Sequence, residues 1–358
     1  MSSVRNMSRV TIYKDPQRYV NQVSLALLQN GEVVAVFDED RGREHLDNGF
    51  ASLIRSRDGG KTWDSSKKVT VLGCDDRVGN WDPAVTQLAA GTLIVNICQR
   101  YIGDPSTWQR YDYETWMGTF TLKSHDNGET WSEPTPVNVR PMKHGGTRTA
   151  ALELPDGTLL LGLYGRMTSF GEWPYNDYET SRAYLAVSND SGDHWERYAT
   201  LAYDPANYLA FQEPALVRLA SGTLVCMVRA HTIPNKKFDR LYVMFSEDEG
   251  ASWSLPKRTN IWGYPPHLLN LHDGRTLMTY GYRRPPGGVR GCISEDGLTW
   301  DAAQEFVICE GGHHRVAGWH TGYPSTVQLS DGTILTGYHL FSDDEAPVQY
   351  IQCSRYCL

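Results

Sequence analysis

The stretch Ser56-Arg-Asp58-Gly-Gly60-Lys-Thr-Trp63 follows the pattern Ser-x-Asp-x-Gly-x-x-Trp, and this pattern recurs along the chain. Three further complete copies start at Ser124, Ser188 and Ser246, and a shortened fifth copy runs from Ser294 to Trp300. The pattern is typical of a β-hairpin turn, because Ser and Asp bond local backbone with their side chains and Gly supplies a positive φ. We expect each Trp to fold over its turn and fill the gap between neighbouring sheets.

A second repeat is interleaved with the first and ends in Leu-x-Asp-Gly or a close variant, followed by an apolar run. Its turn glycines lie 52 to 66 residues apart and number six: Gly31, Gly91, Gly157, Gly222, Gly274 and Gly332. The runs after them, such as 32–37 and 158–163, suit strands buried on both faces. Six units of about four short strands each predict an all-β, six-bladed β-propeller, which fits the period better than a two-sheet sandwich does.

The last unit lacks the first repeat, and only 26 residues follow Gly332. We therefore expect the strand near 9–13 to complete the last blade and close the ring. No stretch of the 358 residues is Ser/Pro-rich or of low complexity, so a single domain over 1–358 is the simplest organisation.

Composition excludes several classes of partner. The net charge is −8 and no basic run occurs, which disfavours nucleic acid and anionic membrane surfaces. The N-terminus has no apolar stretch of the signal-peptide kind, and the seven cysteines are scattered, several within apolar runs. We expect a cytoplasmic protein, and the lack of phosphate-loop, nucleophile-elbow or zinc-type motifs predicts no cofactor.

The two repeats together resemble the sialidase (neuraminidase) superfamily, in which the first repeat is called the Asp box. The resemblance covers nearly the whole chain. It implies the propeller fold more strongly than the chemistry, because the boxes lie on outer hairpins and other propellers also carry them. Function has to be sought in the residues that line the channel.

One position of the repeat is expected to line that channel. It lies nine residues before each turn glycine, at the start of the innermost strand, and its occupants are Gln22, Asp82, Arg148, Glu213, Pro265 and Tyr323. A packing core would not select so many polar and ionisable side chains. The spacing therefore indicates a polar site at the centre of the propeller.

Two of these positions match the catalytic pattern of the family. Sialidases use a Tyr nucleophile whose phenol is deprotonated by a Glu, together with an Asp acid/base and three arginines that bind the substrate carboxylate. The resemblance implies Tyr323 as nucleophile, Glu213 as its partner and Arg229 as one of the arginines. A phenol, with a pKa near ~10, needs such a carboxylate to act as a nucleophile near neutrality.

The resemblance places the acid/base in the loop 37–49, a few residues after an arginine. Asp47, which follows Arg41, is the preferred candidate, and Glu44 is the alternative because the loop length is uncertain.

The sequence also departs from the family pattern. The first-blade arginine corresponds to Asn21, and Arg18 would reach that place only with a gap. The third arginine has no single match, since Arg283, Arg284 and Arg290 all qualify, and Arg148 could compensate from blade three. An Arg–carboxylate fork is directional, so Asn21 predicts altered affinity or an altered substrate.

Other polar residues near the inner strands are candidates for substrate contact. Asp82 could bond a sugar hydroxyl or cap its own turn. His45, His267 and His320 are further candidates; a metal site with Asp47 or Asp82 is less favoured, because scattered histidines are more often satisfied by hydrogen bonds. Aromatic rings for sugar stacking, or for packing between blades, are Trp81, Trp173, Trp262, Trp319 and Tyr264.

The leading hypothesis is an exo-acting, retaining glycoside hydrolase for a terminal acidic sugar, sialic acid or a related one. One alternative keeps the fold but uses two carboxylates among Asp47, Asp82 and Glu213 on a neutral or uronic sugar. Another is a non-catalytic propeller that binds glycans or proteins, in which Tyr323 and Glu213 would lie too far apart to hydrogen-bond.

Overall fold

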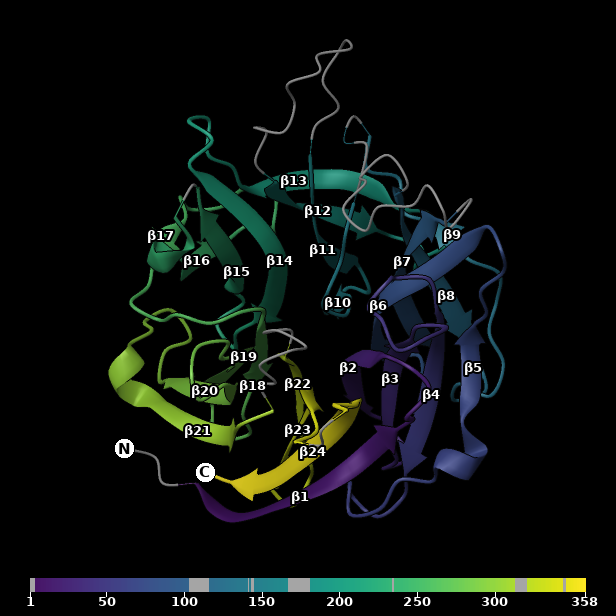
Figure 1. The fold of residues 1–358 in the computed structure, drawn as a ribbon. Helices are drawn as coiled ribbons and strands as arrows, with labels where there is room; N and C mark the ends of the chain where they lie inside the picture. Colours follow the sequence, from purple (N-terminus) through teal and green to yellow (C-terminus); the bar gives the residue numbers. More distant parts are fainter. Residues whose placement is uncertain are drawn as a thin grey trace.

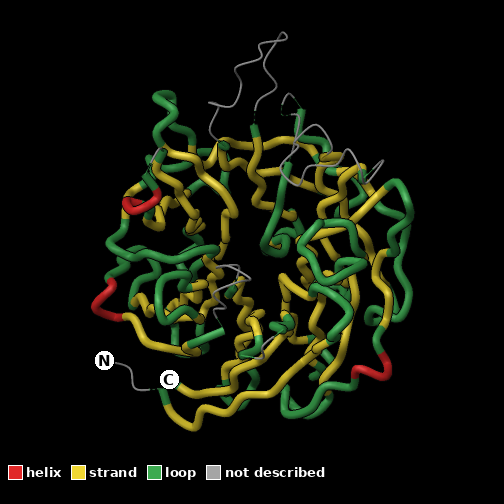
Figure 2. Tube along the Cα trace, viewed as in Figure 1, coloured by secondary structure: helices red, strands yellow, loops and turns green. Residues whose placement is uncertain are grey.

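The computed structural model describes residues 4–102, 116–140, 142, 145–166, 181–233, 235–312, 321–343 and 346–358. In this part of the chain six four-stranded antiparallel sheets radiate around a channel, which confirms the six-bladed propeller (Figure 1). Strands and loops make up nearly all of it, and the described helices are three short 3-10 turns, η1 (Ser65–Lys67), η4 (Lys236–Phe238) and η5 (Ala302–Gln304) (Figure 2). No helix among the described residues is long and apolar enough to cross a membrane.

Each blade runs from its innermost to its outermost strand in chain order, except the last. Blade 1 contains β2 (Val20–Leu27), β3 (Val33–Glu39), β4 (Phe50–Ser56) and β5 (Val69–Leu72). Blade 2 contains β6 (Val78–Gln87), β7 (Leu93–Tyr101), β8 (Trp116–Ser124) and β9 (Thr135–Pro136). Blade 3 contains β10 (Leu152–Glu153), β11 (Leu159–Gly165), β12 (Arg182–Ser188) and β13 (Glu196–Ala202).

The remaining blades complete the ring. Blade 4 contains β14 (Leu209–Arg218), β15 (Leu224–Thr232), β16 (Arg240–Ser246) and β17 (Lys257–Arg258). Blade 5 contains β18 (Pro266–Asn270), β19 (Thr276–Gly281), β20 (Gly288–Ser294) and β21 (Glu305–Glu310). Blade 6 contains β22 (Gly322–Gln328), β23 (Ile334–Phe341), β24 (Gln349–Cys357) and, as its outermost strand, β1 (Arg5–Lys14). The N-terminal strand β1 therefore completes the last blade, so that the two ends of the chain pair within one sheet.

The hydrophobic core lies between the blades. Second strands such as β3 and β11 are buried along their whole length, as their unbroken apolar sequences predict. Phe37 and Ile54 of blade 1 pack with Leu335 of blade 6, and equivalent clusters fill the other gaps. Burying apolar faces on both sides of each sheet fixes the blades relative to one another, and so fixes the residues at their inner edges.

The Asp boxes have the predicted hairpin geometry. In the first box, Ser56 Oγ accepts a hydrogen bond from the Gly60 amide at 2.8 Å, and Asp58 Oδ1 accepts from the amides of Lys61 and Thr62 at 3.0 and 2.9 Å. Trp195 shows the predicted packing across blades, since it joins a cluster with blade 2 residues and its Nε1 donates to Thr121 at 3.1 Å.

The hydrogen bonds of the Asp boxes lead us to expect that the folded protein loses stability in acid. Burial opposes ionisation of Asp58, but its hydrogen bonds from Thr62, Ser56 and Lys61 prevail and lower its pKa to about 2. In an unfolded chain the pKa of Asp is about 3.9, so this stabilisation is complete above about pH 4 and is lost as the pH falls through about 2. Urea unfolding at pH 6, 4 and 3 should show a falling midpoint, with a shallower fall in Asp58→Asn. If the urea midpoint of Asp58→Asn fell as steeply with pH as those of the wild type and of the exposed-site control Asp343→Asn, this role of Asp58 would be contradicted.

Candidate active site

Four inner strands share one distortion. The pairing of β2, β6, β14 and β22 with their neighbours shifts register at Gln22, Asp82, Glu213 and Tyr323, as at a β-bulge. Each of these residues has φ between 51° and 55°, in the left-handed region that residues other than Gly rarely occupy. Bulges of this kind re-aim a side chain and cluster at functional sites. They coincide with four of the six positions that the sequence predicts to line the channel.

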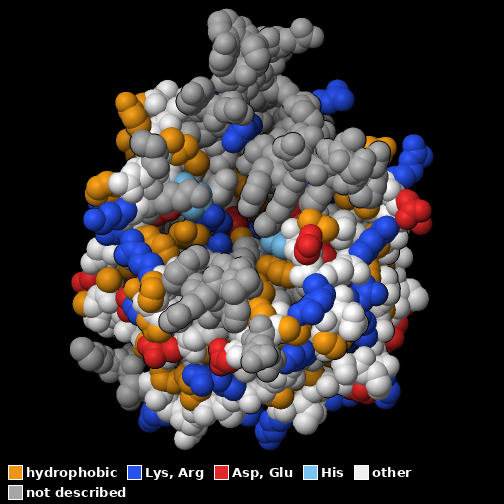
Figure 3. All heavy atoms as spheres, viewed as in Figure 1, with side chains coloured by type: hydrophobic (Ala, Val, Ile, Leu, Met, Phe, Trp, Pro, Cys, Tyr) orange, Lys and Arg blue, Asp and Glu red, His pale blue; other side chains and the backbone are white. Residues whose placement is uncertain are grey.

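The bulges of blades 4 and 6 bring Tyr323 and Glu213 together. Tyr323 Oη donates to Glu213 Oε1 at 3.2 Å, although the two residues are 110 positions apart. Both are buried, with 6% and 3% of their surfaces exposed. The separation that the non-catalytic alternative predicted is not seen. Figure 3 shows the face of the propeller seen in Figure 1, and basic, acidic and histidine side chains gather at the hollow in its middle.

Arg229 extends this pair into a chain of contacts. Its Nη1 donates to Glu213 Oε2 at 2.8 Å, and its Nε donates to His231 Nε2 at 2.8 Å. His231 Nδ1 in turn lies 2.7 Å from Asp239 Oδ2. A guanidinium only donates, so Nε2 of His231 is the acceptor and its Nδ1 carries the proton that is shared with Asp239. His231 and Asp239 were not predicted from the sequence; the signal for His231 was the alternation along β15, which places residues 229 and 231 on one face.

The charges around the pair set its protonation. Burial raises the pKa of Glu213, but the charge and hydrogen bond of Arg229, with Arg283 and Arg148, outweigh burial and the pKa lies below its usual value. Burial and the Glu213 charge raise the pKa of Tyr323, against the opposing charges of Arg283 and Arg229. At neutral pH the arrangement is a neutral phenol hydrogen-bonded to an ionised carboxylate, which is able to accept the phenol proton.

Among the three candidates for the third arginine, Arg283 lies in the site. Its guanidinium is 4.7 Å from the centre of the Tyr323 ring and 5.2 Å from that of Tyr264, over which Arg229 also lies at 4.2 Å. Arg283 Nε donates to the Thr321 carbonyl at 3.1 Å. Its Nη2 is buried and has no hydrogen-bond partner among the described residues, which leaves a cationic donor for an anionic group.

Arg284 and Arg290 point elsewhere. Arg284 stacks on Trp262 at 4.1 Å and donates to the Lys237 carbonyl at 3.3 Å on an exposed surface. Arg290 stacks on Tyr282 at 3.6 Å and pairs with Glu305 at 3.3 Å. The Arg284 side chain thus lies on a different aromatic ring from those of Arg283 and Arg229.

No described arginine of blade 1 takes the place of Asn21. Asn21 Nδ2 donates to Asp38 Oδ2 at 2.7 Å across β2 and β3, and both residues are fully buried. Burial, with the charges of Asp40, Asp82 and Asp47, raises the pKa of Asp38 well above its usual value. Arg18 instead lies 4.7 Å from the Phe50 ring and 3.9 Å from Glu39. A neutral amide–acid pair thus replaces a cation.

Asp47 and Asp82 are two further predicted carboxyl groups, and the charge of Asp82 acts on Tyr323. Asp47 contacts His45 Nε2 at 2.9 Å and Arg100 Nη1 at 3.4 Å, and the Arg100 side chain is fully buried. Burial raises the pKa of Asp82 well above its usual value; Arg148 opposes this, whereas Glu213 and Asp47 add to it. Asp82 Oδ1 is buried without a hydrogen-bond partner among the described residues. Burial therefore favours the protonated form of Asp82.

The remaining predicted site residues have the following neighbours. Arg41 pairs with Asp76 at 3.2 Å, away from Tyr323, and Glu44 is exposed. His45 stacks on Tyr19 with ring centres 4.8 Å apart. Burial and the charge of Arg148 lower the pKa of His267 to about 4. His320, Trp173 and Trp319 lie outside the described residues.

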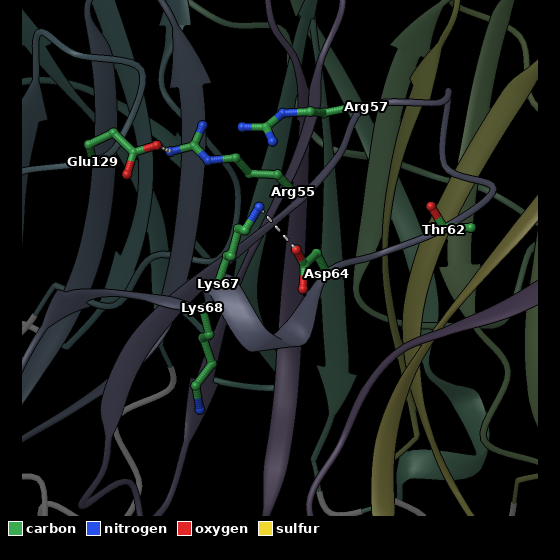
Figure 4. Close-up of a pocket in the computed structure, with 7 residues that line it drawn as sticks. All are labelled: Arg55, Arg57, Thr62, Asp64, Lys67, Lys68 and Glu129. Carbon is green, nitrogen blue, oxygen red and sulfur yellow. Dashed lines mark ion pairs between the residues drawn. The ribbon is translucent and has the colours of Figure 1, made fainter.

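The described part of the chain contains no group of three or more His, Cys, Asp or Glu side chains placed to hold a metal ion. A separate pocket at the outer edge of blades 1 and 2 is lined by basic and acidic side chains that largely pair with one another (Figure 4). There Arg55 contacts Glu129 at 2.9 Å and Lys67 contacts Asp64 at 3.7 Å. The channel centre therefore remains the candidate site.

A family model for the BNR repeat-like domain matches residues 47–336. The chain belongs to the BNR repeat-like domain family. No curated protein matches its sequence.

Solved structures share the fold of this BNR repeat-like propeller. A protein of unknown function from Dyadobacter fermentans has a TM-score of 0.84 and 23% identity over 100% of both chains. The intramolecular trans-sialidase from Ruminococcus gnavus, in complex with oseltamivir carboxylate, has a TM-score of 0.71 and 14% identity over 100% of this chain and 98% of that one. The α-L-arabinanase from Penicillium chrysogenum, complexed with arabinobiose, has a TM-score of 0.65 and 15% identity over 98% of each. The predicted likeness to sialidases is thus confirmed for the fold, and the predicted repeat is that of the BNR repeat-like domain family.

Asp239→Asn tests the chain of contacts behind Glu213. The new amide would keep an oxygen for the Thr232 amide, which now bonds Asp239 Oδ1 at 2.7 Å, but would present an N–H to His231 Nδ1. His231 would then carry its proton on Nε2, and this N–H would face the N–H groups of Arg229, which also only donate. We expect ¹⁵N NMR to show the other tautomer of His231. An unchanged tautomer would contradict the assignment.

Proposed function

We propose that this BNR repeat-like propeller is an exo-acting glycoside hydrolase that removes a terminal acidic sugar with retention of configuration. The observation that carries the proposal is the 3.2 Å hydrogen bond from Tyr323 Oη to Glu213, with Arg229 on the other carboxylate oxygen at 2.8 Å. A phenol with a buried, ionised base beside it can act as a nucleophile that carries no charge before it reacts. A neutral nucleophile suits an anionic sugar, because it adds no like charge to the site.

The reaction divides into two steps. In the first, Tyr323 Oη bonds to the anomeric carbon, its proton passes to Glu213, and the glycosidic oxygen leaves with a proton from a carboxylic acid. In the second, water attacks the anomeric carbon, gives one proton to the acid/base, and the phenol recovers its proton from Glu213. Asp47 is the acid/base that the family resemblance implies. Asp82, buried and neutral, is the second candidate for that proton.

The acidic group of the substrate would lie against Arg283 and Arg229. The unpartnered Nη2 of Arg283 and the shared position of both guanidinium groups over Tyr264 support this placement. On the blade 1 side the Asn21–Asp38 pair offers hydrogen bonds but no positive charge. This favours an acidic sugar that needs two arginines rather than three, and sialic acid itself becomes one member of a wider class.

A second candidate function uses two carboxylates on a neutral or uronic sugar. The raised pKa of Asp82 and the lowered pKa of Glu213 favour it, because a pair of carboxyl groups with separated pKa values is what a general acid and its partner require. In this version Tyr323 orients Glu213 and forms no bond to the sugar.

A panel of fluorogenic glycosides tests the proposal. It should contain the methylumbelliferyl α-sialoside, a second 2-keto-acid glycoside, glucuronide and galacturonide, and the neutral glucoside, galactoside and arabinofuranoside. We expect cleavage of one or more acidic members and none of the neutral ones. Cleavage confined to neutral members would support the two-carboxylate candidate, and no cleavage by a folded protein would overturn the proposed function.

A further inference from the structure

Arg148 crosses the channel from blade 3 to the opposite blade. Its Nη2 donates to the Tyr323 carbonyl at 3.0 Å and approaches the Val23 carbonyl of blade 1 at 3.5 Å. Its guanidinium carbon lies 4.8 Å from the centre of the Tyr323 ring. Only 4% of the residue is exposed, so this charge interacts with protein rather than with solvent.

The Tyr323 backbone needs such support. Its φ of 51° is unfavourable for a bulky residue, and the following residue is Pro324, which restricts the conformation of its predecessor further. The register of β22 against β23 is interrupted between Gly322 and Ser325, so the sheet does not hold this segment by regular pairing. A charge-assisted hydrogen bond from Arg148 to the Tyr323 carbonyl fixes the peptide that follows the strained residue.

The same guanidinium also acts on the phenol. Arg148 and Arg283 lie 4.8 and 4.7 Å from the Tyr323 ring centre, and the His339 ring stacks on it at 5.3 Å with an angle of 24°. A cation at an aromatic ring stabilises the negative charge that develops as the phenol loses its proton. These contacts leave the ring little freedom to turn away from Glu213.

We propose that Arg148 is a positioning residue for Tyr323, which holds its strained backbone and its ring toward Glu213, and is not a third arginine for the acidic group of the substrate. The inference rests on the proposed function only in that Tyr323 is the nucleophile. It changes the role that the sequence predicted for Arg148. It also leaves Arg229 and Arg283 as the arginines of blades 4 and 5 that face the acidic group.

The experiment compares Arg148→Met and Arg148→Lys with the wild type. Met keeps the length of the side chain without a donor or a charge, whereas Lys keeps one donor and the charge. With a substrate from the panel, we expect Arg148→Met to lower kcat about 10- to 100-fold with KM changed less than about threefold, because misplacement of a reacting group affects the chemical step. Arg148→Lys should restore part of kcat. A rise in KM confined to acidic substrates, with kcat unchanged, would overturn the proposal.

A second measurement needs no substrate. With ζ-¹³C-labelled tyrosine, the Tyr323 signal is identified by its loss in Tyr323→Phe, and its shift and titration are followed in each Arg148 variant. We expect Arg148→Met to move this signal and raise the pH at which it titrates, and Arg148→Lys to do so less. The matched control is Arg182→Met, which removes an arginine 3.6 Å from the ring of Tyr203, a partly exposed tyrosine outside the site.

The two readouts separate the two proposals. An unchanged Tyr323 signal in a folded Arg148→Met protein overturns the positioning role, whether or not any glycoside is cleaved. A shifted signal in a protein that cleaves no glycoside supports the positioning role while the proposed hydrolase function fails. If Arg148→Met does not fold, the Lys variant carries the same test, since its weaker donor must still shift the Tyr323 signal.

Discussion

Tyr323→Phe is expected to lower kcat on a cleaved glycoside by at least about 10³-fold, because it removes the atom that forms the bond to the sugar while leaving the ring in place. The aromatic ring would keep its contacts with Arg148, Arg283 and His339, so binding should change little. We expect KM, or the Kd of the released sugar, to stay within a few fold of wild type. Initial rates and isothermal titration with that sugar measure the two effects.

The matched control is Tyr338→Phe. Tyr338 lies in the same blade, is fully buried, and donates to Gln352 at 3.0 Å outside the site. It should lose about 1–3 kcal/mol of stability through the missing hydrogen bonds with Gln352 and Ser354, and keep its activity. Full activity in Tyr323→Phe would exclude the phenol as nucleophile and leave the two-carboxylate mechanism.

Glu213→Gln is expected to have the second largest effect, on activity and on stability together. The variant has no base for the phenol, so kcat should fall about 10²- to 10⁴-fold. It also leaves the guanidinium of Arg229, whose side chain is 13% exposed, without its counter-charge, for which a loss of up to about 3–5 kcal/mol in the free energy of unfolding is typical. Urea unfolding and initial rates measure the two effects.

The pH dependence of stability follows from the lowered pKa of Glu213. A carboxyl group whose pKa is lower in the folded than in the unfolded state stabilises the protein above its unfolded pKa, about 4.3, and this stability is lost as the pH falls through the folded value. Glu213→Gln should therefore lose more stability at pH 7 than at pH 3. An equal loss at both pH values would contradict the ionised Glu213–Arg229 pair.

Blade 5 offers a matched control for Glu213. Glu305 accepts a hydrogen bond from Tyr280 and contacts Arg290 at 3.3 Å, so a second Tyr–Glu–Arg group lies away from the channel centre. Glu305→Gln should lower stability without lowering kcat. If both Glu variants lost activity in proportion to stability, Glu213 would have a structural role only.

The sequence predicted the fold and the inner-strand positions because both follow a period. The turn glycines repeat every 52 to 66 residues, so counting back nine from each finds Asp82, Glu213 and Tyr323 without knowledge of the structure. These residues prove to be bulged, with positive φ. No composition signal marks a bulge at a residue other than Gly, so the strain itself could not be predicted.

Sequence spacing did not predict which contacts are made by residues that reach the site from second strands or through long side chains. Asp38 and His231 lie on β3 and β15, and their roles depend on which neighbour each faces. Arg148 occupies a predicted position, yet its guanidinium spans the channel to the carbonyls of Val23 and Tyr323. Arg41 qualified by spacing but pairs with a nearby acid instead. A flexible side chain of this length takes its direction from tertiary contacts that sequence spacing does not encode.

Asn21 is the departure from the family pattern with the clearest structural consequence. Its bond to Asp38 places a buried neutral pair where the resemblance implies an arginine. A carboxylate on the anomeric carbon would then be held by fewer cations. This is why the proposed substrate class is broader than sialic acid.

Covalent capture tests the central claim, that Tyr323 is the nucleophile, most directly. A fluorinated glycosyl fluoride of the sugar that the panel identifies should react, and then break down slowly enough for intact-mass measurement and peptide mapping. We expect one glycosyl unit per chain, on the peptide that contains Tyr323, and none in Tyr323→Phe. A glycosyl unit on Asp47, Asp82 or Glu213, or turnover without any trapped intermediate, would contradict the Tyr323 mechanism.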